Sequence, residues 1–78
     1  MEKGTVVKSL AGRDKGRLLA VMQSENGSVL VCDGKERPID RPKSKNIRHI
    51  ECIGLSVKET DMRSNKSLKK ALRQFMQD

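Results

Sequence analysis

Basic residues gather in a short stretch flanked by glycine near the start of the chain. Its members are Gly12, Arg13, Lys15, Gly16 and Arg17, and apolar runs precede and follow it. Glycine adopts positive φ without steric cost and lets a backbone approach a ligand closely. Exposed N–H groups and cationic side chains on such a turn attract phosphate. The stretch therefore predicts a phosphate-binding turn between two strands, and a hairpin turn that uses glycine only for geometry is the alternative.

A second basic stretch follows later in the chain, and between residues 41 and 48 it holds no acidic residue. Pro42 and the polar residues 43–46 predict a flexible loop, which is costly to pack and easily ordered on a polyanion. We expect phosphate contacts from this stretch as well, with a merely solvated loop as the alternative. The residues concerned are Arg37, Arg41, Lys43, Lys45 and Arg48.

Net charge indicates the class of partner. The 78 residues include 17 Lys and Arg against 10 Asp and Glu, which gives a formal charge of +7. A charge of this sign and size is typical of proteins that bind polyanions, although it also serves solubility. A chain this short forms one domain whose core is too small for a deep substrate cavity.

Aromatic content indicates how a nucleic acid would be bound. Phe75 is the only aromatic residue, and its spacing within an apolar helical pattern predicts a core position. Proteins that read single strands stack bases on exposed aromatic rings. The chain therefore favours contact with the backbone and shape of folded or double-stranded RNA.

Other chemistries find no support in the residue pattern. Cys32 and Cys52 stand apart from each other with only His49 nearby, so a zinc site lacks ligands. We expect two free thiols, buried or half-buried, because disulfides are rare in reducing compartments. His49 and Cys52 are three residues apart on a predicted strand, hence on opposite faces. The 12–16 turn lacks the Gly-Lys-Ser/Thr ending of a nucleotide-binding P-loop. The chain predicts no metal, no cofactor and no catalysis.

Alternating turn signals and apolar runs predict five strands, over residues 4–9, 17–24, 28–33, 36–39 and 47–53. Asn26-Gly27 predicts a hairpin with a type I′ turn, which needs positive φ at both residues. Pro38 places the fourth strand at a sheet edge. So many short strands in so short a chain favour a mainly-β fold, a small five-stranded SH3-like barrel.

A C-terminal helix is expected to cover this barrel. The runs 18–22 and 29–32 are continuously apolar, which means that both faces of the central hairpin need cover. Apolar residues recur at helical spacing from Leu68 to Met76, and Ser64 or Ser67 can cap the start. A helix that docks on a partner protein or on RNA is the alternative.

The order of residues resembles the KOW motif. Gly4-Thr-Val-Val, the turn Gly12-Arg-Asp-Lys-Gly16 and the apolar run from Leu18 to Val21 match its strand, turn and strand. The motif is found in large-subunit ribosomal proteins and in transcription elongation factors. Residues 17–34 look like the following hairpin of the archaeal and eukaryotic ribosomal proteins, and residues 36–50 are similar to small bacterial KOW-domain proteins.

This resemblance implies particular roles for the turn. KOW loops of similar ribosomal proteins contact ribosomal RNA, so Arg13, Lys15 and Arg17 are the positions expected to touch RNA. Gly12 and Gly16 then shape the backbone. Asp14 departs from the otherwise positive charge of the turn, and we expect it to orient Arg17 or Lys15.

The combined expectation is a monomeric, cytoplasmic, non-catalytic protein that binds structured RNA, ribosomal RNA above all. It comprises a KOW-type barrel (1–54), a connection (55–64) and a helix (65–78). No apolar run approaches the roughly twenty residues of a membrane span. A protein-interaction adaptor that uses the helix or the edge near Pro38 is the alternative function.

Overall fold

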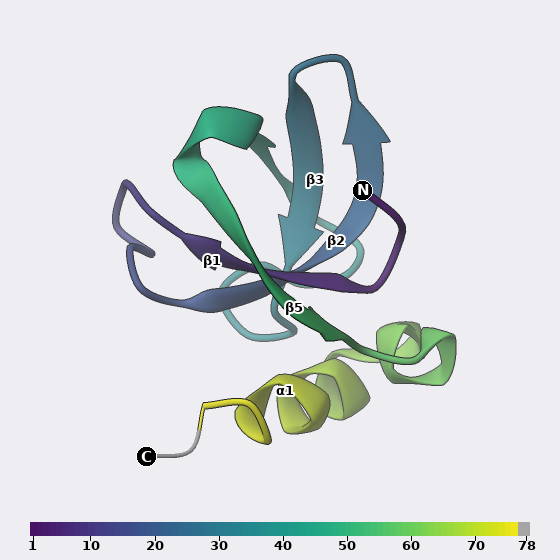
Figure 1. Cartoon of the computed structure of the whole chain (residues 1–78). Helices are drawn as coiled ribbons and strands as arrows, with labels where there is room; N and C mark the ends of the chain where they lie inside the picture. Colours follow the sequence, from purple (N-terminus) through teal and green to yellow (C-terminus); the bar gives the residue numbers. More distant parts are fainter. Residues whose placement is uncertain (77–78) are drawn as a thin grey trace.

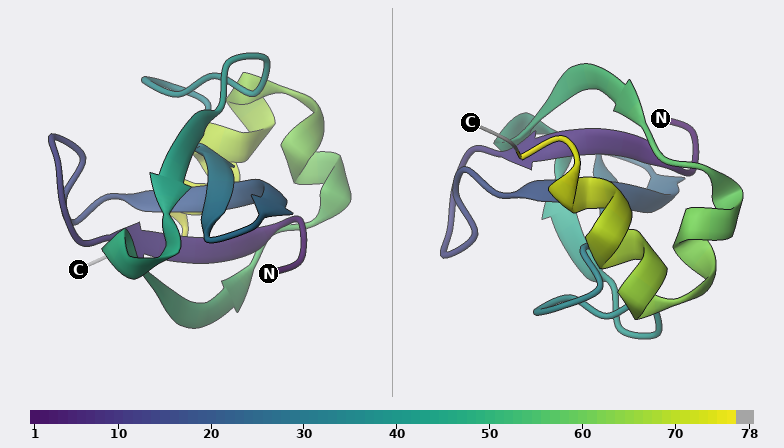
Figure 2. Two further views of the ribbon diagram at one scale, coloured as in Figure 1. Left: turned by 90° about the horizontal axis from the view of Figure 1, so that it is seen from above. Right: turned by 90° about the horizontal axis from the view of Figure 1, so that it is seen from below.

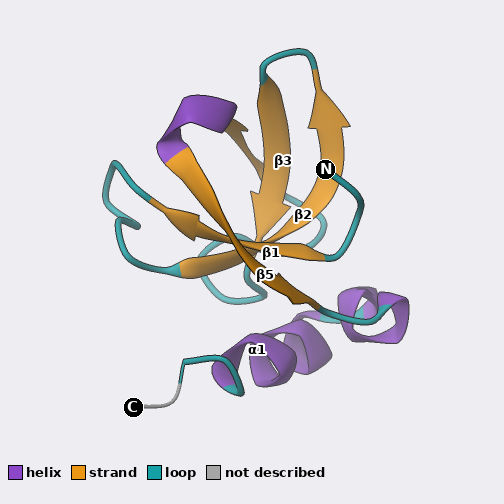
Figure 3. Ribbon diagram, in the orientation of Figure 1, coloured by secondary structure: helices purple, strands orange, loops and turns teal. Residues whose placement is uncertain are grey.

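The computed structural model describes residues 1–76, which form an antiparallel sheet followed by one α-helix (Figure 1). The strands are β1 Thr5–Ser9, β2 Leu18–Glu25, β3 Ser28–Cys32, β4 Lys43–Asn46 and β5 Ile50–Ser56. Two 3-10 helices, η1 Ile47–His49 and η2 Glu59–Arg63, and the helix α1 Asn65–Arg73 complete the chain (Figure 3). The mainly-β class and the C-terminal helix are confirmed.

The five strands lie in the order β4-β3-β2-β1-β5. Strand β2 is therefore central, between β3 and β1, and β1 pairs with β2 on one side and with the edge strand β5 on the other. Strands β4 and β5 are the two edges of the hydrogen-bonded sheet, and η1 joins them at one end. Gly54, at φ 78°, lies in β5 where the register against β1 shifts, and a glycine bulge of this kind bends a strand.

The expected fourth strand over residues 36–39 is wrong. The Oδ1 atom of Asp33 accepts N–H bonds from Lys35 and Arg37, both at 2.9 Å, and these bonds hold the segment in a turn. Pro38 has no N–H to give to a ladder. The fourth strand forms instead over the residues expected to be a flexible loop, where Lys43 pairs with Val31 and Lys45 with Val29.

Smaller differences concern the last strand and the hairpin turn. Residues 47–49 form η1 and not the start of the strand, because the side chain of Asn46 caps them by accepting the N–H of Arg48 at 2.8 Å. The hairpin at Asn26-Gly27 is confirmed, but its turn is not type I′. Within the described chain only glycines have positive φ, so Gly27 at 74° meets that requirement and Asn26 does not.

Apolar residues cover both faces of the sheet, as the continuous runs predicted. One cluster lies between the sheet and α1 and includes Val6, Ala20 and Cys32 from the strands with Leu68 and Leu72 from the helix. The cluster on the opposite face contains only residues of the sheet, and its members are Val7, Leu19, Val21, Val29, Val31 and Ile50. Figure 2 shows α1 lying across one face of the strands.

Helix α1 packs on its own sheet, so its apolar side is not free to dock elsewhere. Leu68 is fully buried and Leu72 is 3% exposed. The Oγ atom of Ser64 accepts the N–H of Ser67 at 3.1 Å, which confirms Ser64 as the N-cap. The helix ends at Arg73, before the expected limit, and the expected residues 77 and 78 lie outside the described part of the chain.

The helix start is tied to the loop that follows β3. The side chain of Asn65 accepts the N–H of Ile39 at 2.8 Å. Gly34, at φ 80°, lies so close to the helix that an added Cβ would overlap the carbonyl oxygen of Asn65. Because of this contact, the loop after β3 and the helix form opposite sides of one depression.

Candidate functional site

The segment 12–17, termed here the basic turn, has the glycine geometry that the sequence predicted. Gly12 and Gly16 both have φ of 88°. The N–H of Gly16 donates to the carbonyl of Ser9 at 2.8 Å, and the N–H of Arg17 donates to the carbonyl of Asp14 at 2.9 Å. A Cβ on Gly16 would meet no atom within 4 Å, so glycine is needed here for its backbone conformation and not for space.

Lys45 is buried beneath the basic turn and holds it in place through hydrogen bonds from its ammonium group. Its Nζ atom donates to the Oγ of Ser9 at 2.7 Å, to the carbonyl of Ala11 at 2.8 Å and to the Oδ1 of Asp14 at 2.8 Å. The residue is only 6% exposed. The expectation that Lys45 lies exposed in a flexible loop is therefore wrong. Its charge is used inside the protein, where it connects β4 to the turn between β1 and β2.

Asp14 is the buried counterion of Lys45, and the expectation that it orients Arg17 or Lys15 is wrong. Burial alone would raise the pKa of Asp14. The hydrogen bonds from Lys45 and Ser9, together with the charges of Lys45 and Lys43, outweigh that effect and hold the pKa below 3.8. The Oδ2 atom is buried and has no hydrogen-bond partner within residues 1–76.

The cations of the basic turn differ in exposure. Arg13 and Lys15 are exposed, while the side chain of Arg17 is 41% exposed. Arg17 forms an ion pair with Glu36 at 3.1 Å and lies 3.9 Å from Asp33. Exposed ion pairs contribute little free energy, so a phosphate can displace Glu36 at small cost.

Two depressions adjoin the basic turn, and Arg17 borders both. The smaller, about 290 Å³, is lined by Arg13, Asp14, Arg17, Glu36 and Arg37. It brings Arg37, from the second basic stretch, beside the cations of the turn. Arg37 thus joins Arg13 and Arg17 at one depression although it is distant from them in the sequence.

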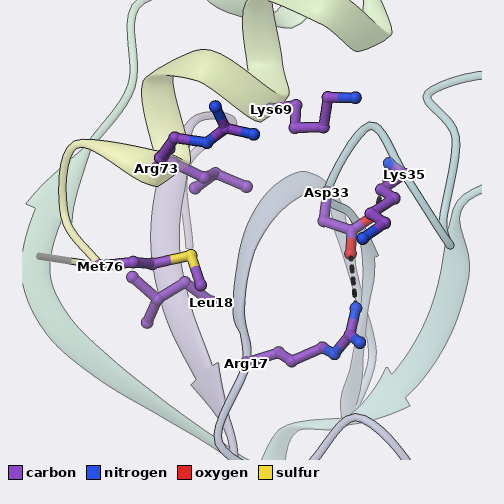
Figure 4. Close-up of a pocket in the computed structure, with 8 residues that line it drawn as sticks. Arg17, Leu18, Asp33, Lys35, Lys69, Arg73 and Met76 are labelled. Atoms are coloured by element: carbon purple, nitrogen blue, oxygen red, sulfur yellow. Dashed lines mark hydrogen bonds and ion pairs between the residues drawn. The ribbon is translucent and has the colours of Figure 1, made fainter.

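The larger depression, about 350 Å³, lies between α1 and the starts of β2 and of the loop after β3 (Figure 4). Three of its cations, Lys35, Lys69 and Arg73, were not among the residues predicted from the sequence. Lys69 and Arg73 are one helical turn apart on α1, which carries no acidic residue. The absence of acidic residues from this helix is the sequence feature that could have identified Lys69 and Arg73. The complete lining is Arg17, Leu18, Asp33, Lys35, Lys69, Leu72, Arg73 and Met76.

The remaining predicted binding residues, Lys43, Arg41 and Arg48, do not line either depression. Lys43 is half-buried on β4, near enough for its charge to lower the pKa of Asp14. Arg41 and Arg48 are exposed and line neither depression. The N–H of Leu10 donates to the carbonyl of His49 at 2.8 Å, so η1 lies beside the end of β1 that leads into the basic turn.

The cysteines and the histidine do not form a site. Cys32 is buried, and burial together with the charge of Asp33 raises its pKa to about 11. Cys52 is exposed, contrary to the expectation that it is at least half-buried. His49 is exposed in η1 and not in a strand. Within residues 1–76, no three side chains of the metal-binding types are grouped to hold a metal ion.

Comparisons with known proteins leave the function open: no protein-family model matches the chain, and no curated protein matches its sequence. Among the described residues, no helix is both long and apolar enough to span a bilayer.

Proposed function

We propose that this protein is a non-catalytic, cytoplasmic RNA-binding protein that contacts structured RNA, ribosomal RNA above all, through the basic turn. The observation that carries the proposal is the buried Lys45–Asp14 pair beneath the turn. It holds the backbone in place while Arg13 and Lys15 point their charge at solvent. A binding loop that is ordered before it meets its ligand loses less conformational entropy on binding.

The fold type is part of the proposal. A bent, five-stranded antiparallel sheet, whose edge strands are joined by η1, is compatible with an SH3-like barrel of the KOW type. The strand-turn-strand order from Gly4 to Val21, which resembles the KOW motif, coincides with β1, the basic turn and β2. The resemblance and the charge distribution therefore favour the same surface.

Contacts with phosphate and RNA shape are expected to dominate binding. Phe75 is half-buried and packs against the cluster beneath α1, so the only aromatic ring is not an exposed stacking surface. Arg37, which lines the smaller depression with Arg13 and Arg17, and the half-buried Lys43 are further cations near the turn. Lys45 has a structural role and is left out of this surface.

The salt dependence of RNA affinity tests the proposal. Fluorescence anisotropy with a labelled RNA hairpin should give a slope of log affinity against log salt of about −3 if about four phosphates are neutralised, at roughly −0.7 to −0.9 for each phosphate. Replacing Arg13 and Lys15 together by Gln should flatten this slope by about one to two units.

Lys58→Gln with Arg63→Gln is a matched control, because it removes the same two charges at η2, at the opposite end of the molecule in Figures 1 and 2. The control should change the slope by less than half as much as the turn variant. Equal effects of the two variants would show that only net charge matters. A parent protein that binds no RNA at low salt would overturn the proposal. Binding to a protein through a mainly apolar contact, the alternative function, would show little dependence on salt.

A further inference from the structure

The larger depression combines charge and apolar surface in a way that a phosphate-binding patch does not need. Cationic side chains stand along three sides of it, with Arg73 and Lys69 from α1, Lys35 from the loop after β3, and Arg17 at the start of β2 (Figure 4). Leu18 and Met76 occupy the remaining side, and Leu72 adds further apolar lining. The depression therefore offers both cationic side chains and an apolar surface to a ligand.

Three of the four cations around the depression lack an acidic partner among residues 1–76, and the fourth, Arg17, pairs with Glu36 and Asp33. No carboxylate of residues 1–76 forms an ion pair with Lys35, Lys69 or Arg73. Asp33 is the only acid in the lining, and its Oδ1 is already engaged by two backbone N–H groups. Like charges at positions i and i+4 of a helix, such as Lys69 and Arg73, destabilise it unless an anion lies between them. The charge of the depression thus favours an anionic occupant.

The apolar side restricts what that occupant can be. A free phosphate would leave the exposed apolar surface of Leu18 and Met76 uncovered. A volume of about 350 Å³ lies at the lower end of the range for small-ligand sites, roughly 300 to 1,000 Å³. Apolar side chains and guanidinium planes are the surfaces on which proteins without exposed aromatic rings can place an unstacked base.

From these features we infer that the depression binds one nucleotide unit, with its phosphate on Arg17, Lys69 and Arg73 and its base against Leu18 and Met76. The nucleotide is either an unpaired position of a bound RNA or a free mononucleotide, since the chemistry recognised is the same. Arg17 borders both this depression and the basic turn. With RNA as the source, the inference rests on the proposed function, and a bulged nucleotide then enters the depression while flanking phosphates lie on the turn.

Hairpins that differ at one position test the RNA source. The parent should bind a hairpin with a single bulged uridine about tenfold more tightly than the fully paired hairpin, and an abasic bulge should lose most of that preference; this is the size of effect that one base contact gives. Lys69→Gln with Arg73→Gln should reduce the preference to about twofold or less. Lys66→Gln with Lys70→Gln removes the same charge from the same helix outside the depression, and it should keep the preference.

Titration of the labelled protein with uridine monophosphate, adenosine monophosphate and inorganic phosphate, followed by amide chemical shifts, separates this inference from the proposed function. Nucleotide shifts at residues 17, 18, 69 and 73 without any RNA binding would support the depression and overturn the RNA function. Equal shifts from inorganic phosphate would overturn the nucleotide assignment, and so would equal loss of bulge preference in the two helix variants. Met76→Ser should weaken nucleotide binding and leave phosphate binding unchanged.

Discussion

The segments 12–17 and 41–48 look alike in the sequence, yet the molecule uses them differently. Both are rich in cations and contain residues that break regular structure. The first is an exposed turn whose glycines take positive φ. The second forms strand β4 and η1, and it sends Lys45 into the interior beneath that turn. Segment 12–17 exposes its cations to solvent, whereas segment 41–48 contributes the buried Lys45, which holds the basic turn in place.

Strand geometry explains the difference. Lys43 and Lys45 pair with Val31 and Val29, so both lie on the face of the second apolar cluster. The aliphatic part of a lysine can cover apolar surface while its ammonium reaches a polar partner. At Lys45 that partner is Asp14, the acid that seemed out of place in a basic turn. A cluster of basic residues therefore does not by itself indicate how many of them meet a ligand.

Removing the ammonium of Lys45 should give the largest effect. Lys45→Met leaves the Asp14 carboxylate buried without a counterion, and we expect a loss of about 3–5 kcal/mol in the free energy of unfolding, measured by urea denaturation. Lys43→Met, two residues away on the same face but half-buried, should cost less than about 1 kcal/mol. Equal costs would remove the distinction between the two lysines.

The double variant Asp14→Leu with Lys45→Met, compared with the two single variants, tests whether Asp14 and Lys45 stabilise the protein as a pair. Replacing a buried ion pair by apolar residues is often close to neutral, so the double variant should be more stable than Lys45→Met alone. A double variant whose loss equals the sum of the two single losses would show that Asp14 and Lys45 do not interact energetically.

Acid should remove the stabilisation that the Asp14–Lys45 pair gives to the folded protein. The pKa of Asp14 is held below 3.8 in the folded state, so the unfolded chain binds more protons in acid. The contribution of the pair is complete at neutral pH, declines as the pH nears 3.8 and continues to decline as the pH falls through the folded pKa. Urea denaturation between neutral pH and about pH 3 should show the stability difference between the parent and Asp14→Leu with Lys45→Met moving against the parent. A constant difference would contradict this.

Gly16→Ala should have a smaller effect on stability and almost none on binding. The substitution meets no steric obstacle, so its cost is the strain of positive φ, about 1–2 kcal/mol. Arg13, Lys15 and Arg17 keep their charge in this variant. Thermal unfolding should report the loss, while anisotropy with the RNA hairpin should report an affinity within about threefold of the parent. A large loss of affinity would mean that RNA contacts the turn backbone itself.

Removing the exposed cations of the second segment should give the smallest effect. Arg41 and Arg48 line neither depression, so Arg41→Gln with Arg48→Gln should flatten the salt slope of RNA binding by less than about one unit. The turn variant Arg13→Gln with Lys15→Gln is the reference. If both variants flatten the slope equally, the two segments share the RNA-binding surface and the contrast between them is wrong.

Local patterns in the sequence predicted most of the fold. The first three strands, the hairpin, the helix and its Ser64 cap follow from apolar periodicity and turn residues. Strand β4 did not, because Lys-Ser-Lys-Asn has little strand propensity and its pairing with β3 is a tertiary effect. Residues 36–39 look more like a strand, but the side chain of Asp33 holds the segment as a turn.

The candidate site was predicted only where it is local. Glycine conformation in the basic turn follows from the sequence, since the requirement for positive φ depends on neighbouring residues. The buried pair joins residues 31 positions apart, and no local pattern assigns Asp14 to Lys45 rather than to Arg17. Lys35, Lys69 and Arg73 come together only because α1 packs beside the loop after β3.

Strand order has a consequence for how the chain folds as it is synthesised. Strand β1 is synthesised before β5, which is one of its two sheet partners, and before α1, which covers Val6. Contacts between such distant segments form slowly because a long loop must close first. A nascent chain therefore carries uncovered apolar strands until β5 and α1 have been synthesised. We expect a product that stops before Asn65 to be degraded or to aggregate, and not to accumulate as a folded sheet.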